Sequence, residues 1–234
     1  MPWLSDNRNN KKIARDLVFN CGPKKSVLLL PGYRCECVKL ALSKGVITPK
    51  TICTFAERDP AVAEHIRWWV EKEWTYHLPI IHEGELHEME MHPIDLGYID
   101  LFGNLTKVEM EWVKNQLIPN LMPNADLAFT FSVPIRGNEF MKAALATMQV
   151  KYPALYEKKM ERVACLEEQV RPVAALYACL FEQLLTNYDY EIDFHNYRDR
   201  GPFTMLLVRL TKIAKKPHFL MMEFNKRNGK VRAV

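Results

Sequence analysis

Residues 26–36 read SVLLLPGYRCE, and the fold can be worked out from this stretch. Ser26–Leu30 is a short apolar run, which predicts a buried strand. Pro31 and Gly32 end that run in a turn. Residues 36–45 then carry apolar side chains at helical spacing and end at a glycine, which predicts a helix. A strand, a turn and a helix in this order form the first unit of an α/β fold.

The same alternation continues along the chain. Further strands are expected at 51–55, 78–82, 94–102, 126–133, 188–197 and 203–213, with an edge strand at 217–224. Helices are expected near 13–18, at 60–74, from the Thr106–Glu109 capping box onward, and over most of 138–186, and a loop is expected at 119–125. This alternation predicts a mostly parallel sheet with helices on both faces. A tight turn joins the last two long strands, so we expect a C-terminal antiparallel β-hairpin.

Length and composition favour a globular chain. Its 234 residues, 48% hydrophobic and 26% charged, suit one large domain or two small ones. The longest apolar run, Val173–Phe181, is too short to span a bilayer, and the first residues lack the plan of a signal peptide. None of the six cysteines forms a Cys-x-x-Cys pair, so we expect reduced thiols in a cytoplasmic protein. We expect an N-terminal extension (1–25), an α/β domain (26–213) containing the helical segment 138–186, and a basic tail (214–234).

Charge is distributed unevenly along the chain. The formal net charge is +4, but it is +5 over residues 1–34, −9 over 35–197 and +8 over 198–234. Basic ends indicate a polyanionic partner such as nucleic acid. Aromatic side chains also interleave with basic ones at 195–209, a pattern that suits base stacking and phosphate contacts. The alternative is that the basic ends are only solvated.

Polar residues follow each of the first four expected strands. The segments are Pro31–Glu36, Glu57–Pro60, His82–Leu86 and Asp100–Asn104. The carboxyl ends of parallel strands meet at one edge of a sheet, which is where open α/β folds bind ligands.

This order of elements and these strand ends resemble the class I S-adenosylmethionine-dependent methyltransferases, over residues 24–213. The resemblance implies a seven-stranded sheet whose last strand is inserted antiparallel, and S-adenosylmethionine as cofactor. The family usually shows two or three glycines in the first turn, whereas this chain has only Gly32. One alternative is therefore a catalytically inactive methyltransferase-like module that binds nucleic acid or a protein partner. Another is a different enzyme on the same sheet.

The resemblance assigns the first and third strand ends to the cofactor. Pro31, Gly32 and Arg34 would hold its methionine part, beside a helix N-terminus that favours a carboxylate. The alternative for this segment, which these residues taken alone favour, is an ordinary turn between a strand and a helix. Glu85 and Leu86 would lie beside the adenine. For the third strand end, a solvated acidic loop is the alternative interpretation.

The second strand end would hold the ribose. Glu57, followed by Arg58, would accept hydrogen bonds from both ribose hydroxyls, because a carboxylate is an acceptor only. The alternative role of Glu57 is to complement the dipole of the next helix. Asp59, directly before Pro60, suits that structural role better, which leaves Glu57 for the ribose.

The methyl acceptor would lie after the fourth strand, where Asp100 and Asn104 are the candidate catalytic residues. Asp100 would also contact the cofactor, and it would hold or deprotonate the acceptor. The segment lacks the proline pair of the amine-directed nucleic-acid methyltransferases. It looks more like the Asp-x-x-Gly variant of some phage and RNA-associated relatives. Asp95 is the alternative if the strand register differs, and a turn-capping Asp100 is the structural alternative.

Substrate contacts are expected where the fifth strand ends and in the terminal hairpin. Ser132, Arg136 and Asn138 would lie at the carboxyl edge of the sheet, with Arg136 as a candidate phosphate contact. Arg198 and Arg200 would add phosphate contacts if the partner is nucleic acid. No membrane partner is expected.

The histidines of the third strand region are not expected to bind a metal. His82, His87 and His92 recur every five residues among glutamates. Ligands on one helix face need a spacing of three or four. A solvated acidic loop is therefore favoured.

Overall fold

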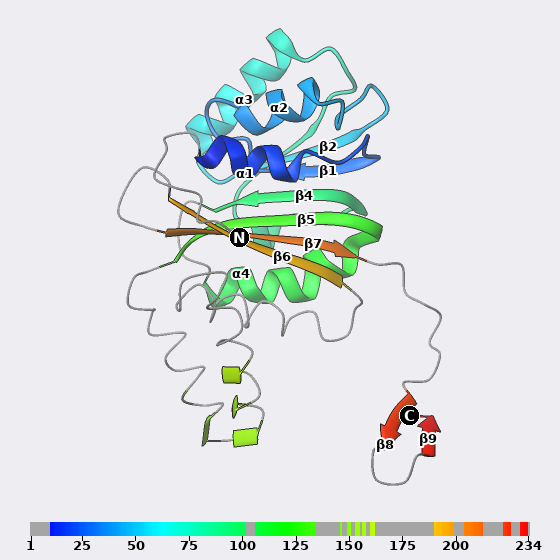
Figure 1. Ribbon diagram of the computed structural model, residues 1–234. Coiled ribbons are helices and arrows are strands. Elements are labelled where there is room, and N and C mark those ends of the chain that lie inside the picture. The colour runs from blue at the N-terminus through cyan, green and yellow to red at the C-terminus, as the bar shows by residue number, and fades with distance from the viewer. Residues whose placement is uncertain are drawn as a thin grey trace.

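A computed structural model describes residues 10–101 and 106–133, short helical pieces between 146 and 161, and the segments 190–198, 204–212, 222–225 and 230–233. Seven strands form one sheet in the order β3-β2-β1-β4-β5-β7-β6 (Figure 1). They are β1 (Ser26–Leu29), β2 (Ile52–Glu57), β3 (Ile80–Glu83), β4 (Ile94–Asp100), β5 (Leu121–Val133), β6 (Tyr190–Arg198) and β7 (Thr204–Lys212). Neighbours among β1 to β5 pair parallel, whereas β7 is antiparallel to both β5 and β6. The predicted α/β sheet with its antiparallel C-terminal hairpin is confirmed.

Helices pack on both faces of this sheet (Figure 1). On one face lie α1 (Asn10–Val18), α2 (Glu36–Ser43) and α3 (Pro60–Glu73), and on the other lies α4 (Lys107–Trp112). Two short helical turns, Val113–Leu117 and Ile118–Asn120, extend α4. The Glu109 carboxylate accepts the backbone N–H of Thr106 at 2.9 Å, so the predicted capping box begins α4.

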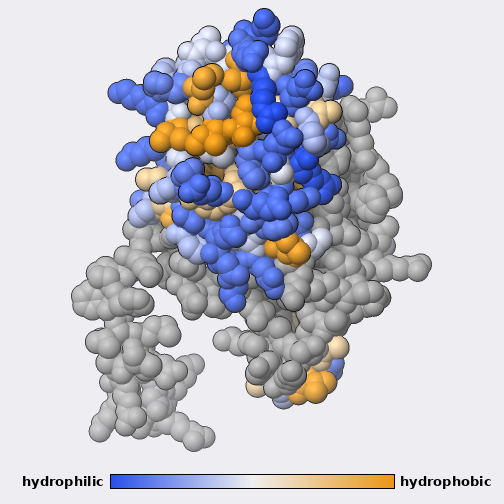
Figure 2. All heavy atoms as spheres, turned by 180° about the vertical axis from the view of Figure 1, so that it is seen from behind, coloured by the Kyte–Doolittle hydropathy of each residue, from blue (hydrophilic) through white to orange (hydrophobic). Residues whose placement is uncertain are grey.

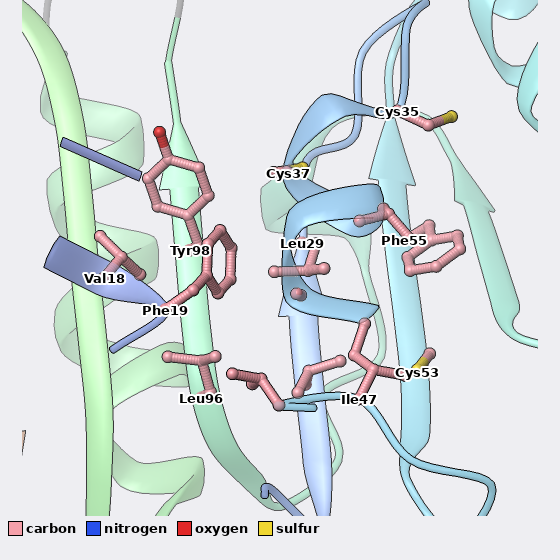
Figure 3. Packing of buried hydrophobic residues seen from close by; sticks show 14 of the residues in the cluster. Val18, Phe19, Leu29, Cys35, Cys37, Ile47, Cys53, Phe55, Leu96 and Tyr98 are labelled. Carbon is pink, nitrogen blue, oxygen red and sulfur yellow. The ribbon is translucent and has the colours of Figure 1, made fainter. Parts of the chain in front are cut away.

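A core cluster of buried residues lies between the sheet and the first three helices (Figure 3). The Phe19 ring meets the Tyr98 ring edge to face, with centroids 5.5 Å apart. Ala14 and Val18 of α1 are also buried in this cluster. Residues 1–25 were expected to form an extension, but α1 and Phe19 pack into the core of the α/β domain.

Two segments differ from the predicted elements. The loop prediction at 119–125 is wrong from Leu121 onward, because β5 begins there and pairs with Ile94 across an irregular register. Leu121 and Ala125 are buried, and Asn124 adopts a positive φ of 61°, so apolar burial outweighs the turn-like composition. Residues 217–221 of the edge strand predicted at 217–224 lie outside the described residues, and the rest of it does not join the main sheet. Strand β8 (Met222–Asn225) instead pairs with β9 (Lys230–Ala233) in a separate two-stranded sheet.

Strand β3 forms one edge of the sheet and carries exposed apolar side chains. Ile80 and the preceding Leu78 are exposed, as is Ile52 at the start of the neighbouring β2. Seen from behind, apolar residues gather in the upper part of the molecule, at the height of β1, β2, α2 and α3 (Figure 2). The edge strand has only four residues, which limits pairing with another chain. Among the helices described, none has the length and apolar character needed to cross a membrane.

Gly97 in the middle of β4 occupies a position with no room for a side chain. A Cβ added there would lie 2.6 Å from Cδ1 of Leu127, which is buried. We expect Gly97→Ala to lower the free energy of unfolding by about 1–3 kcal/mol, since overpacking forces Leu127 out of its rotamer. Urea unfolding measures the change. Gly22→Ala is the control, because a Cβ at Gly22 meets nothing within 4 Å. Equal midpoints for the two variants would contradict the prediction.

Candidate active site

The strand order reverses between β1 and β4, and this reversal defines the candidate site. The chain leaves β1 for α2 on one face and leaves β4 for α4 on the other (Figure 1). In open α/β sheets, the crevice at such a switch point is where ligands bind. The carboxyl ends of β1, β2 and β4 carry Gly32, Glu57 and Asp100, so three of the predicted site residues share this edge.

The turn after β1 is compact and left-handed at two positions. Gly32 has a φ of +59° and Cys35 a φ of +50°. The Cys35 N–H donates to the Gly32 carbonyl at 3.2 Å, which closes the turn just before α2 begins. A Cβ added at Gly32 would meet no atom within 4 Å, so there is open space over the turn. Pro31 is buried and Arg34 is exposed.

Glu57 ends β2 with a half-buried side chain. Its carboxylate accepts the N–H of Asp59 at 3.0 Å, and its carbonyl accepts the N–H of Gly84 at 3.0 Å. Asp59 caps α3, because its carboxylate accepts from Ala61 at 2.9 Å and from Val62 at 3.3 Å. The predicted role of Asp59 as the cap of α3 is confirmed. A carboxylate can accept about four hydrogen bonds, so the Glu57 carboxylate can accept further hydrogen bonds besides the one from Asp59.

Hydrogen bonds hold the loop after β3 in place. A ring nitrogen of His82 lies 3.0 Å from the Glu85 carbonyl, and the Glu88 carboxylate accepts the Glu85 N–H at 3.3 Å. The Glu85 side chain is exposed and Leu86 is half-buried. Within the described part of the chain, no three His, Cys, Asp or Glu residues are placed to hold a metal ion.

Asp100 ends β4 with a half-buried side chain. The hydroxyl of Thr130, a buried residue of β5, donates to its Oδ1. The alternative candidate, Asp95, lies near the start of β4, at the amino ends of the parallel strands. There it accepts the Lys25 N–H at 2.9 Å, and Lys24 lies 3.8 Å away. Asp95 is therefore part of a structural cluster and does not belong to this site.

Arg15 of α1 is a half-buried cation near the candidate site that the sequence interpretation missed. Burial acts to lower the pKa of its guanidinium, but Tyr98, Cys37 and Asp100 together raise that pKa above its ordinary value. The Nε of Arg15 is buried and has no hydrogen-bond partner among the described residues. Arg15 therefore lies within electrostatic reach of Asp100. The sequence signal that could have indicated Arg15 is its place directly after Ala14, beside the apolar face of the predicted helix.

Cys35, Cys37 and Cys53 are buried thiols in the core cluster between the sheet and the first three helices. Burial raises the pKa of Cys35 to about 11 and those of Cys37 and Cys53 to about 12, from an ordinary value of 9.0. The folded state therefore holds these protons more tightly than the unfolded state. Stability from this source is present below pH 9 and is lost as the pH rises toward 12.

We expect the three thiols to resist alkylation in the folded protein at pH 8, because the thiolate is the reacting form. Iodoacetamide labelling followed by peptide mass mapping measures the rate at each cysteine. Half-buried Cys21 is the internal comparison. In denaturant all four should react alike, and fast labelling of Cys37 without denaturant would contradict the burial argument.

The expected substrate residues are only partly placed. Ser132 near the end of β5 pairs with Met205, and Arg198 at the end of β6 pairs with Thr204. Both backbone positions lie at the carboxyl edge that also carries Asp100. The remaining predicted residues, Asn104, Arg136, Asn138 and Arg200, lie outside the described residues.

Comparisons with known proteins show the fold. No family model and no curated protein matches the sequence. An N-methyltransferase, NodS, from Bradyrhizobium japonicum has a TM-score of 0.54 at 12% identity, over 90% of this chain and 100% of that one. A Clostridium thermocellum protein described as an rRNA methylase has a TM-score of 0.52 at 9% identity, over 90% of this chain and 99% of that one. An O-methyltransferase from Bacillus cereus gives 0.51 at 11%, over 90% and 84%. The chain therefore has the fold of class I methyltransferases.

Proposed function

We propose that the protein is an S-adenosylmethionine-dependent methyltransferase. The observation that carries the proposal is the meeting of the Gly32 turn, Glu57 and Asp100 at the switch point of the sheet. The Bacillus cereus protein that shares this fold was crystallised with S-adenosylhomocysteine. S-adenosylmethionine supplies a methyl group that is already activated on a sulfonium, so the protein contributes mostly binding and positioning.

The residues at this edge fit such a cofactor. The open space over Gly32 and the N–H groups at the start of α2 suit the methionine end, with Pro31 and Arg34 beside them. The Glu57 carboxylate suits the two ribose hydroxyls, because Asp59 rather than Glu57 caps α3. Glu85 and Leu86, in a loop held by hydrogen bonds, suit the adenine.

Asp100 is the residue we assign to the methyl acceptor. Thr130 holds one carboxylate oxygen, so the carboxylate is oriented before a substrate arrives. It would accept a hydrogen bond from an N–H or O–H of the acceptor and direct the lone pair of the acceptor atom toward the methyl group. Arg15 acts as a positioning residue on Asp100. Asn104 remains a proposed partner in this role.

Nucleic acid is the acceptor class we propose. The support is the net charge of +5 over residues 1–34 and +8 over residues 198–234. Arg198 lies at the carboxyl edge, and Ser132, Arg136, Asn138 and Arg200 are proposed to join it. A second candidate function is a nucleic-acid-binding module that takes no cofactor, which the single glycine of the first turn favours.

Calorimetric titration with S-adenosylmethionine and S-adenosylhomocysteine tests the proposal. We expect micromolar binding of both ligands to the full chain. If neither ligand gives heat or shifts the melting temperature of a folded sample, the enzyme proposal fails. Salt-dependent binding of polynucleotide would then support the second candidate.

A further inference from the structure

Three aromatic rings form a column on the surface beside the Gly32 turn. The Tyr33 ring stacks on the His65 ring, with centroids 3.9 Å apart and planes 13° apart. The His65 ring in turn stacks on Trp68, at 5.4 Å and 27°. Tyr33 belongs to the turn after β1, whereas His65 and Trp68 belong to α3. The column therefore runs from the carboxyl edge of the sheet onto the outer surface of α3.

Both end rings of this column are open to solvent. Tyr33 is 61% exposed and Trp68 is 52% exposed. Neighbouring aromatics behave differently, because Trp69 is buried and packs on Trp74, with centroids 6.1 Å apart. The column thus lies outside the core. Planar rings with open faces are the platforms on which single-stranded bases stack.

Charges around the column leave stacking as the main source of affinity. On α3, the three carboxylates Glu64, Glu71 and Glu73 outnumber the cations Arg67 and Lys72, so the helix itself attracts no phosphate. Arg67 is also held by Glu83 at 2.7 Å. Phosphate attraction would instead come from the basic ends of the chain.

We infer that Tyr33, His65 and Trp68 form a base-stacking site for single-stranded nucleic acid, outside the cofactor site. The inference rests on the proposed function in one respect, since it locates the strand that carries the methyl acceptor. A strand with one nucleotide at Asp100 would continue along the carboxyl edge onto the rings. The shared chemistry is an unpaired base, so RNA and DNA strands both qualify.

The test compares ring with non-ring replacements at Trp68. Binding of short fluorescein-labelled oligo(U) and oligo(dT) strands is measured by anisotropy, alongside a duplex of equal length. We expect Trp68→Leu to weaken single-strand binding about tenfold or more, since stacking is worth about 1–3 kcal/mol per base. Trp68→Phe keeps a ring and should retain most of the affinity. Tyr33→Leu and Tyr33→Phe repeat the comparison at the other end.

Two controls separate the column from other causes. Leu78→Ala changes a side chain that is 79% exposed and is not one of the three stacked rings, and this variant should bind as the wild type does. Trp68→Leu should keep its affinity for S-adenosylmethionine, whereas Glu57→Ala should lose the cofactor and keep the oligonucleotide.

Equal affinities of Trp68→Leu and Trp68→Phe would overturn the inference, as would preference for duplex over single strand or no binding of either strand. The methyltransferase proposal survives these results if cofactor binding persists. If Trp68→Leu loses more affinity for oligo(U) than for oligo(dT), RNA is identified as the natural ligand. If it loses more affinity for oligo(dT), DNA is identified.

Discussion

Glu57→Ala should reduce affinity for S-adenosylmethionine about 100-fold or more. The carboxylate is assigned two hydrogen bonds from ribose hydroxyls, and bonds to charged groups are each worth about 1.5–3 kcal/mol. The fold should tolerate the change, since Asp59 caps α3 through its own carboxylate. Calorimetric titration of wild type and variant measures the loss, with S-adenosylhomocysteine as the second ligand because it has the same ribose.

Asp59→Ala is the matched control for this prediction. It removes the cap of α3, so the free energy of unfolding should fall by about 1 kcal/mol. The backbone N–H that Glu57 accepts is retained, so cofactor affinity should change little. Glu57→Gln should lie between wild type and Glu57→Ala, since the amide keeps one acceptor. If Glu57→Ala binds the cofactor as the wild type does, Glu57 only holds the Asp59 turn.

The first half of the fold was predictable because its signals are local. Strands β1 and β2 are short apolar runs that end in turns, and α3 begins at an Asp-Pro pair with a measurable cap. The position of Glu57 at the end of β2 was predictable for the same reason. Glu57 stands at a strand end, two residues before another acidic residue that already serves the helix.

The contacts around Asp100 were not predictable, because they join distant parts of the chain. Thr130 reaches Asp100 only because β4 and β5 pair in parallel with that register. Arg15 comes within electrostatic reach of Asp100 because α1 packs against β4 through Phe19 and Tyr98. Hydrophobic periodicity reports which face of α1 is buried, but it says nothing of which strand that face covers.

At the start of β5, in contrast, a local signal was present but predicted the wrong element. Residues 119–125 contain two prolines and two asparagines, a composition that predicts a loop. The strand forms nevertheless, and it places its irregular pairing and the positive φ of Asn124 within that segment. Burial of Leu121 and Ala125 outweighs the local preference.

Phe19→Ala should lower the free energy of unfolding by about 3–5 kcal/mol. The Phe19 ring is buried against Tyr98 at the point where α1 ends, so its removal leaves a cavity between α1 and β4. Denaturant unfolding followed by circular dichroism and fluorescence measures the change. Asn20→Ala is the control, since Asn20 is exposed and surface substitutions usually stay within about 0.5 kcal/mol.

The result also decides whether α1 is part of the α/β domain or an appendage to it. If α1 belongs to the domain, its amides should resist hydrogen exchange as strongly as those of β4 in the wild type, and Phe19→Ala should weaken both together. If α1 is an appendage, only its own amides should exchange faster and the unfolding midpoint should stay unchanged. Arg15 would then lack a fixed position beside Asp100, and its assignment as a positioning residue would fall with it.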